Sequence, residues 1–326
     1  MKPIVYMTRK VQKEGIDLLQ GSCDLRIWQE DCPVPRDVLL ENVREAQGLY
    51  VTVLDTVDNN LLEHAPNLKV VSTYAVGYNN IDVAACTARG IPLGNTPGIL
   101  TETTADMAFG LMLAAGRRIV EAAKYVHERR WDSWKPDLML GQDVHHATLG
   151  IIGFGAIGQA LARRAQGFNM QVIFYDPRKD HDPLPEISQF VDLEDLLTRS
   201  DFVSLHVPLT DSTRFLIGEP ELEKMKPTAV LVNTSRGEIV DPQALYQALK
   251  HGKIYAAALD VTYPEPIAAD DPLHELPNCI IVPHIASASH ITRTNMAVLA
   301  ARNLLAGLAG EPMPHCVNPQ VYSTPG

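Results

Sequence analysis

The sequence has 326 residues, 46% of them hydrophobic, and this length predicts two domains of about 150 residues, each with its own core. A formal net charge of -11, with no strong basic cluster, argues against a nucleic-acid partner because such a surface repels phosphates. No apolar run reaches the ~20 residues that cross a bilayer and no secretory signal is evident, so we expect a cytoplasmic protein without membrane association.

Short β-rich runs alternate with helix-like segments along the first hundred residues. Each run of apolar and β-branched residues is followed by a turn or by a segment of helical periodicity. This alternation predicts a parallel sheet covered by helices. The expected strands lie within residues 4–7, 25–29, 48–54, 68–77 and 91–95.

The second half of the chain repeats this pattern more strongly. At least six strands are expected there, and runs such as "LGIIGF" are apolar at successive positions, which is typical of strands covered on both faces. The predicted fold class is α/β, with two Rossmann-like doubly wound parallel-sheet domains and an active-site cleft between them. The six strands lie within residues 148–155, 171–176, 201–208, 229–235, 255–261 and 279–284.

Two long helices are predicted outside these strands. Residues 101–130 have helical periodicity and no proline, so we expect one continuous helix that could join the two domains. A second helix over 291–310 precedes a proline-rich tail with no strand of the second sheet left to pair with, so this segment is expected to return to the first domain. The predicted domains are residues 1–99 with 288–326, and residues 100–287.

A glycine-rich turn follows the first strand of the second half. Gly153, Gly155 and Gly158 form G-x-G-x-x-G between a strand and an alanine-rich helix. In a dinucleotide site the first glycine allows the tight turn, the second lets the backbone approach a pyrophosphate, and the third lets helix and strand pack closely. The phosphates then face the positive end of the helix. Glycines also mark ordinary turns, but strand, turn and helix in this order predict a dinucleotide site.

An acidic residue stands where a ribose would lie in such a site. Asp176 ends the next strand, about 20 residues beyond Gly158, and a carboxylate there accepts hydrogen bonds from the adenosine ribose. The same charge repels the 2'-phosphate of NADP, so NAD(H) is the favoured cofactor. NADP(H) stays possible, because Arg178 and Lys179 follow directly and could receive that phosphate.

Residues whose side chains could take part in catalysis follow three further strands of this half. Arg236, Asp260 with Glu265, and His284 come after successive strands, and the carboxyl ends of parallel strands face the ligand crevice. Each residue alone has an ordinary explanation as a surface charge, a loop acid or a structural histidine. Their joint occurrence behind a dinucleotide turn predicts a catalytic site.

The cysteines indicate no further site. They are five in number, scattered, and never paired as C-x-x-C, so we expect reduced structural thiols rather than disulfides or a metal centre.

The motifs "GIIGFGAIG", "HVPLTDSTRFLI", "LVNTSRGEIVD", "ALDVTYPEP" and "VPHIASAS" resemble, in this order and spacing, the D-isomer-specific 2-hydroxyacid dehydrogenase family. The resemblance covers nearly the whole chain and is strongest to glyoxylate/hydroxypyruvate reductases. It implies NAD(P)H-dependent reduction of small 2-keto acids, such as glyoxylate and hydroxypyruvate, to glycolate and D-glycerate.

The resemblance implies a role for each strand-end residue. Arg236 would bind the carboxylate and keto oxygen of the substrate through its planar fork, His284 would be the acid/base, and Glu265 would favour the protonated imidazole. The remaining substrate contacts would come from the backbone of Val76 and Gly77, from Ser287, and from Trp134 of a partner in a homodimer. The cofactor contacts would come from Gly153, Phe154, Gly155, Ala156, Ile157, Gly158, Asp176, Arg178, His206, Pro208, Thr213, Thr234, Ser235, Asp260 and Thr104.

One departure and two alternatives accompany this interpretation. Ala286 stands where the family usually has glycine, which bears on the loop that carries Ser287. The substrate could be a longer 2-keto sugar acid such as 2-ketogluconate, because pocket length is not readable from the sequence. The chain could also be an NADH-sensing binding protein in which catalysis is vestigial.

Overall fold

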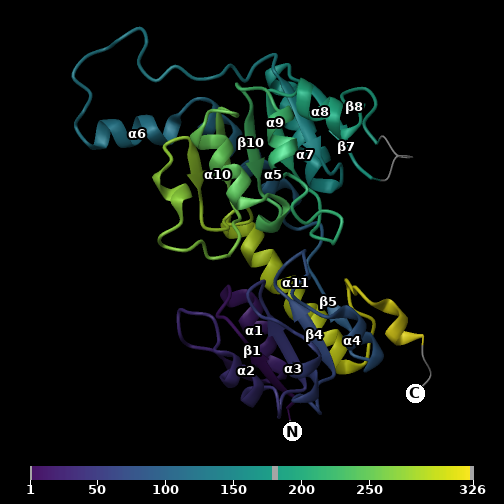
Figure 1. The fold of residues 1–326 in the computed structure, drawn as a ribbon. Helices are drawn as coiled ribbons and strands as arrows, with labels where there is room; N and C mark the ends of the chain where they lie inside the picture. The colour runs from purple at the N-terminus through teal and green to yellow at the C-terminus, as the bar shows by residue number, and fades with distance from the viewer. Residues whose placement is uncertain (1, 178–182, 324–326) are drawn as a thin grey trace. The chain divides into compact units, whose positions relative to one another are not determined.

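The computed structural model describes residues 2–177 and 183–323, and the chain divides into two compact units. Unit 1 is Met1–Leu100 with Ala288–Gly326, and unit 2 is Thr101–Ser287. Both ends of the chain therefore belong to unit 1, which carries the purple and the yellow ribbon in Figure 1. None of the described helices is long and apolar enough to cross a bilayer.

Unit 1 is built on a five-stranded parallel sheet with the order β2-β1-β3-β4-β5. Apolar side chains pack on both of its faces: α1 and α11 cover one face, and α2, α3 and α4 cover the other. Its strands are β1 (Ile4–Met7), β2 (Asp24–Ile27), β3 (Gly48–Val51), β4 (Val70–Thr73) and β5 (Leu93–Gly94). Its helices are α1 (Lys13–Ser22), α2 (Arg36–Asn42), α3 (Asn59–Glu63), α4 (Val83–Ala88), α11 (His290–Ala309) and the 3-10 helix η4 (Pro319–Tyr322).

Unit 2 is built on a seven-stranded parallel sheet with the order β12-β11-β10-β9-β6-β7-β8. The strands are β6 (Thr148–Ile152), β7 (Gln171–Tyr175), β8 (Gln189–Phe190), β9 (Phe202–Leu205), β10 (Val230–Asn233), β11 (Ala256–Leu259) and β12 (Cys279–Ile281). The helices are α5 (Thr101–Gly116), α6 (Ile119–His127), α7 (Ala156–Ala165), η1 (Gln166–Phe168), α8 (Leu193–Arg199), α9 (Glu219–Lys224), η2 (Gly237–Ile239), α10 (Pro242–Lys250) and η3 (Pro272–Glu275).

The strands of unit 2 are buried on both faces, as the run "LGIIGF" predicts. Leu149 and Ile151 of β6 pack beneath α5 and α7, whereas Ile152 packs on the opposite side with α8, α9 and α10. Burying each such side chain contributes roughly 1.5–3 kcal/mol relative to exposure. The predicted α/β class with two parallel, doubly wound sheets is confirmed.

The expected single helix over 101–130 is wrong. The chain forms α5 and α6 instead, with a break at Arg118, whose backbone is left-handed at φ 54°. A left-handed residue ends an α-helix because the next turn can no longer stack on the last one. The Arg118 guanidinium then forms two hydrogen bonds with the Glu121 carboxylate, which fixes the break.

Candidate active site

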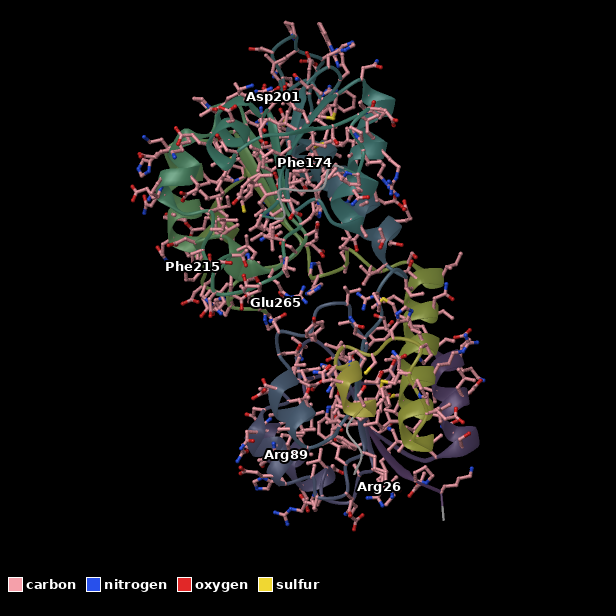
Figure 2. The ribbon with its side chains drawn as sticks, turned by 90° about the vertical axis from the view of Figure 1, so that its right-hand side faces the viewer. Arg26, Arg89, Phe174, Asp201, Phe215 and Glu265 are labelled. Carbon is pink, nitrogen blue, oxygen red and sulfur yellow. The ribbon has the colours of Figure 1, made fainter. Side chains whose placement is uncertain are left out.

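The strand order of unit 2 reverses at β6, which has β7 on one side and β9 on the other. In open parallel sheets ligands bind at the carboxyl ends of the strands flanking such a reversal. Figure 2 shows Asp201, which precedes β9, and Glu265, which follows β11, at opposite ends of unit 2. The glycine turn, Asp176, Arg236, Asp260 and His284 follow strand carboxyl ends, on the side of Glu265.

The three glycines after β6 have the three roles that their spacing predicts. Gly153 is left-handed at φ 93°, and a Cβ on it would lie 2.6 Å from the His206 carbonyl carbon. A Cβ on Gly158 would lie 2.4 Å from the Gly153 oxygen, so α7 packs tightly on the turn. No heavy atom of the described chain lies within 4 Å of a Cβ built on Gly155. The turn therefore leaves open space at the positive end of α7, which fits a phosphate.

Asp176 points into this turn. It is 5% exposed, and its Oδ2 accepts a hydrogen bond from the Phe154 backbone N–H at 2.9 Å. The carboxylate thus lies beside the glycine turn, as a ribose-binding acid must. Arg178, which was expected near a 2'-phosphate, lies outside the described residues.

The segment after β9 closes against the turn. The His206 ring Nε2 lies 2.8 Å from the Ser204 hydroxyl, and burial lowers the pKa of His206 to about 4, so this imidazole is neutral at neutral pH. Further along, the Thr213 hydroxyl donates to the Pro208 carbonyl at 2.6 Å. These contacts fix the loop that the sequence assigned to the cofactor site.

The turn after β10 carries Thr234, Ser235 and Arg236. The Thr234 Oγ1 is buried and has no hydrogen-bond partner in the part of the chain that the structure describes. A buried hydroxyl without a partner is costly, so this one fits a polar group of a bound molecule. With the open turn at Gly155 and the carboxylate of Asp176, it gives unit 2 the features that a dinucleotide requires.

Arg236 lies partly buried at the end of the same turn. Its Nη1 donates to the Ser235 carbonyl at 2.7 Å. Burial lowers the pKa of the guanidinium, while the negative charges of Glu265 and Glu238 act in the opposite direction. The pKa of an arginine is normally so high that the group stays a cation at neutral pH after this decrease.

Glu265 and His284 form a close pair. The Glu265 Oε1 lies 2.5 Å from the His284 Nδ1, and the two side chains are 28% and 31% exposed. The Nδ1 is thereby engaged by the carboxylate, and the pair retains access to solvent through its exposed part. The backbone of His284 is left-handed at φ 50°, an uncommon conformation for a residue other than glycine.

Asp260 holds the loop that carries His284. Its two carboxylate oxygens accept hydrogen bonds from the backbone N–H groups of Ile285 and Ala286 at 2.6 and 2.9 Å, and its carbonyl accepts one from the His284 N–H at 2.9 Å. Burial raises the pKa of Asp260, against the opposing effect of these hydrogen bonds. The left-handed residue here is His284 and not Ala286, so the loop accommodates alanine where the family usually has glycine.

Other expected site residues lie in different surroundings. Ser287 and Thr104 are buried in unit 2, and Thr104 belongs to α5. Val76 lies in unit 1, where its carbonyl accepts a hydrogen bond from the Asn95 side chain at 2.9 Å, and Gly77 is its neighbour. Trp134 is 80% exposed, and in the described part of the chain no hydrogen bond or ion pair joins it to the candidate site residues of unit 2.

One residue that contacts the candidate site was not predicted from the sequence. Asn233 ends β10 in front of Thr234, and its side chain bonds back to the turn that carries Arg236. An asparagine at the end of a strand often holds the following turn with its side chain, so the sequence contained a signal for this contact.

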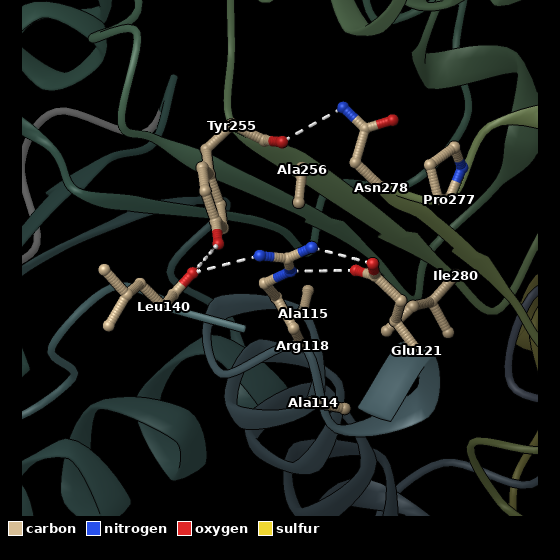
Figure 3. A pocket seen from close by; sticks show the side chains of 10 residues that line it. All are labelled: Ala114, Ala115, Arg118, Glu121, Leu140, Tyr255, Ala256, Pro277, Asn278 and Ile280. Carbon is tan, nitrogen blue, oxygen red and sulfur yellow. Dashed lines mark hydrogen bonds and ion pairs between the residues drawn. The ribbon is translucent and has the colours of Figure 1, made fainter. Parts of the chain in front are cut away.

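A cavity of about 220 Å³ lies at the other end of the sheet. It is bordered by Tyr255 and Asn278, which precede β11 and β12, and by the Arg118–Glu121 pair (Figure 3). The Tyr255 hydroxyl and the Arg118 guanidinium both donate to the Leu140 carbonyl. Because it adjoins the amino ends of these strands, this cavity is separate from the candidate site.

Comparisons with known proteins converge on one family. Residues 109–286 match the model of the D-isomer specific 2-hydroxyacid dehydrogenase, NAD binding domain. The chain is 50% identical to a glyoxylate reductase of Korarchaeum cryptofilum over 98% of this chain and 97% of that protein. The fold is similar to a glyoxylate reductase of Paecilomyes thermophila (TM-score 0.86, 31% identity, 98% and 99% coverage). It is also similar to an NADPH-dependent glyoxylate/hydroxypyruvate reductase of Sinorhizobium meliloti, solved with NADP and malonate (TM-score 0.83, 29% identity, 98% coverage of each chain).

Proposed function

The chain belongs to the D-isomer-specific 2-hydroxyacid dehydrogenases, NAD(P)-dependent oxidoreductases, and from that premise we propose that it reduces glyoxylate and hydroxypyruvate to glycolate and D-glycerate. The observation that carries the proposal is the 2.5 Å contact between Glu265 and His284, beside a partly buried Arg236 at the carboxyl edge of the sheet. A paired imidazole and a fixed guanidinium are what the reduction of a 2-keto acid requires.

Arg236 binds the substrate in this proposal. Its planar fork matches the carboxylate and keto oxygen of a 2-keto acid, and its burial strengthens the attraction because less water screens the charge. The backbone amides of Val76 and Gly77 and the Ser287 hydroxyl are proposed as further contacts to the substrate.

His284 is the proposed proton donor. Glu265 engages Nδ1, which leaves Nε2 to donate a proton to the keto oxygen as negative charge develops there. Reduced nicotinamide, when bound, supplies the hydride for the keto carbon. In the reverse direction His284 accepts the proton of the 2-hydroxy acid.

NAD(H) is the proposed cofactor, with NADP(H) as a possible substitute. The support is the Asp176 carboxylate, which is held against the glycine turn and would repel a 2'-phosphate. Residues 153–158, His206, Pro208, Thr213, Thr234 and Ser235 are proposed to line the cofactor site, with Asp260 and Thr104 at its nicotinamide end. The Sinorhizobium meliloti relative is described with NADP, so family membership alone does not set the preference.

A homodimer is the proposed assembly. Helix α6 has no buried residue, and it extends from unit 2 with a long segment after it (Figure 1). Large apolar side chains are exposed along both, and a second copy would cover them: Ile119, Val120, Val126, Trp131, Trp134 and Leu140. Trp134 is proposed to reach the substrate pocket of the partner.

Steady-state kinetics test the proposed activity. The purified protein is mixed with NADH, and then with NADPH, and with glyoxylate, hydroxypyruvate, pyruvate or 2-ketogluconate, while the nicotinamide absorbance is followed. We expect oxidation of NADH with glyoxylate and hydroxypyruvate at the highest kcat/KM. The proposal is wrong if neither cofactor is oxidised with any of these acids.

A further inference from the structure

Asn233 uses its whole side chain to hold the turn that follows it. It is 1% exposed, and its Oδ1 accepts hydrogen bonds from the Ser235 backbone N–H and hydroxyl at 3.0 and 2.9 Å. Its Nδ2 donates to the Arg236 carbonyl at 2.8 Å. Three hydrogen bonds from one buried amide therefore fix the main chain on both sides of the peptide bond that leads into Arg236.

The same residue is joined to the loop of the proton donor. The Asn233 carbonyl accepts a hydrogen bond from the Asp260 N–H at 2.8 Å, and the Asp260 carbonyl accepts one from the His284 N–H at 2.9 Å. Asn233 is the last residue of β10 and Asp260 directly follows β11. The Asn233 side chain holds the turn to Arg236 and the Asp260 side chain holds the loop after β12, while their main chains join the two segments. These hydrogen bonds therefore help to set the backbone positions of Arg236 and His284.

We propose that Asn233 is a positioning residue for Arg236: its amide sets the turn Thr234–Arg236 so that the guanidinium projects toward the substrate carboxylate. This inference rests on the proposed function, in which Arg236 binds the 2-keto acid. A displacement of about 1 Å in a substrate-orienting group can cost a 10²-fold loss of rate, so the three bonds have a kinetic consequence.

Two variants test the proposal, with one matched control. Asn233→Ala removes all three bonds, whereas Asn233→Asp keeps an acceptor for Ser235 and loses the donor to the Arg236 carbonyl. Asn278→Ala is the control, because the Asn278 amide also donates to two backbone carbonyls of unit 2, of Leu249 and Tyr255, at the amino end of β12 (Figure 3).

We expect Asn233→Ala to lower kcat/KM for glyoxylate by about 10²-fold, with a raised KM and a reduced kcat. Asn233→Asp should lose less, and it remains informative if the alanine variant does not fold. The Kd for NADH, measured by fluorescence against that of Asn278→Ala, should rise much less than kcat/KM falls, although Thr234 and Ser235 of the same turn are proposed to line the cofactor site. The inference is overturned if both variants keep kcat/KM within about threefold of the control, or if NADH binding weakens as much as kcat/KM falls.

The Arg236→Lys substitution separates this inference from the proposed function. If Asn233 acts through Arg236, adding Asn233→Ala to Arg236→Lys should cost little beyond Arg236→Lys alone; an equal loss in both backgrounds contradicts the inference. Full activity of Arg236→Lys contradicts the role of Arg236 itself. Hydrogen exchange of residues 234–237 needs no turnover, and Asn233→Ala should accelerate it; unchanged exchange overturns the inference whether or not the protein reduces glyoxylate.

Discussion

At the residue scale, the chemistry depends on a few side chains whose surroundings set their charge. His206 is partly buried next to a serine hydroxyl, and desolvation lowers its pKa so that it is neutral at neutral pH, whereas His284 contacts a carboxylate. Burial without a charged partner disfavours the cationic form of His206. The histidines that follow β9 and β12 therefore have different surroundings, and of these two only His284 is proposed to transfer a proton.

Replacement of the proton donor should affect turnover far more than stability. His284→Ala removes the group that protonates the keto oxygen, and we expect kcat to fall by about 10²- to 10⁴-fold. His274→Ala, at an exposed histidine in η3, is the control and should keep wild-type kcat. Steady-state kinetics with saturating NADH check this, and a loss of less than tenfold would remove His284 from the catalytic role.

Substitution of the ribose acid should change the cofactor preference. Asp176→Ser removes the charge that repels a 2'-phosphate, so the ratio of kcat/KM for NADPH to that for NADH should rise by at least tenfold. The same ratio measured for Asp192→Ser, at the N-cap of α8, controls for the loss of one negative charge. An unchanged ratio in Asp176→Ser would show that the carboxylate does not face the ribose.

Acid should destabilise the protein in part through His206. Because the folded pKa of about 4 lies below the unfolded value of 6.5, the unfolded state binds more protons in this window. The contribution is fully present above pH 6.5 and is lost as the pH falls toward 4, up to about 3 kcal/mol. His206→Gln cannot titrate, so its Tm should fall less between pH 7 and pH 4.5 than that of the wild type or of His274→Gln. Parallel Tm profiles for all three proteins would refute this.

At the element scale, the strands were predictable and the joints between elements were not. Apolar runs such as Leu149–Ile152 predict buried strands because the hydrophobic effect acts on each residue separately. The left-handed break at Arg118 gave no such signal, since periodicity continues across it into α6. The position of Asp260 at the nicotinamide stays a prediction. Its hydrogen bond from the Ile285 backbone N–H, 25 residues away, leaves no local pattern in the sequence. The glycine turn and Asp176 lie beside each other as their sequence spacing predicts, because that spacing reflects local geometry.

The loop that carries Gly237 contacts the loop that carries Thr262, and this contact leads to a prediction. A Cβ on Gly237 would lie 1.9 Å from the Thr262 carbonyl oxygen, so the loop after Arg236 packs directly on the loop that leads to Glu265. Gly237→Ala should separate the two loops, lowering stability by about 1–3 kcal/mol and kcat/KM by at least tenfold. Gly110→Ala, in α5 with no heavy atom within 4 Å of the new Cβ, should keep or raise Tm. Denaturant unfolding and steady-state kinetics of both variants test this prediction. If Gly237→Ala and Gly110→Ala have the same free energy of unfolding and the same kcat/KM, the close contact has no such role.

At the scale of the whole molecule, the proposed homodimer rests on the exposed apolar residues of α6 and of the segment after it. Val120→Glu places a charge among them, at a residue 51% exposed in one chain, and should shift the protein from dimer to a monomer of about 36 kDa. Leu18→Glu, at an isolated exposed leucine of α1, should leave the dimer intact. Analytical ultracentrifugation at micromolar concentration tests this, and a wild-type monomer would contradict the proposed assembly.

Unit 1 is built from both ends of the chain, and this has a consequence for synthesis. Helix α11 lies so close to α1 that a Cβ on Gly15 would be 2.7 Å from the Ala297 carbonyl oxygen. Met296, Ala300 and Leu304 of α11 complete the core that begins with Val5 of β1. On the ribosome, the first hundred residues therefore wait with one face of their sheet uncovered until the last helix emerges. Unit 2 is contiguous and can fold during that interval, so a chaperone that shields nascent apolar surface would bind the first unit rather than the second.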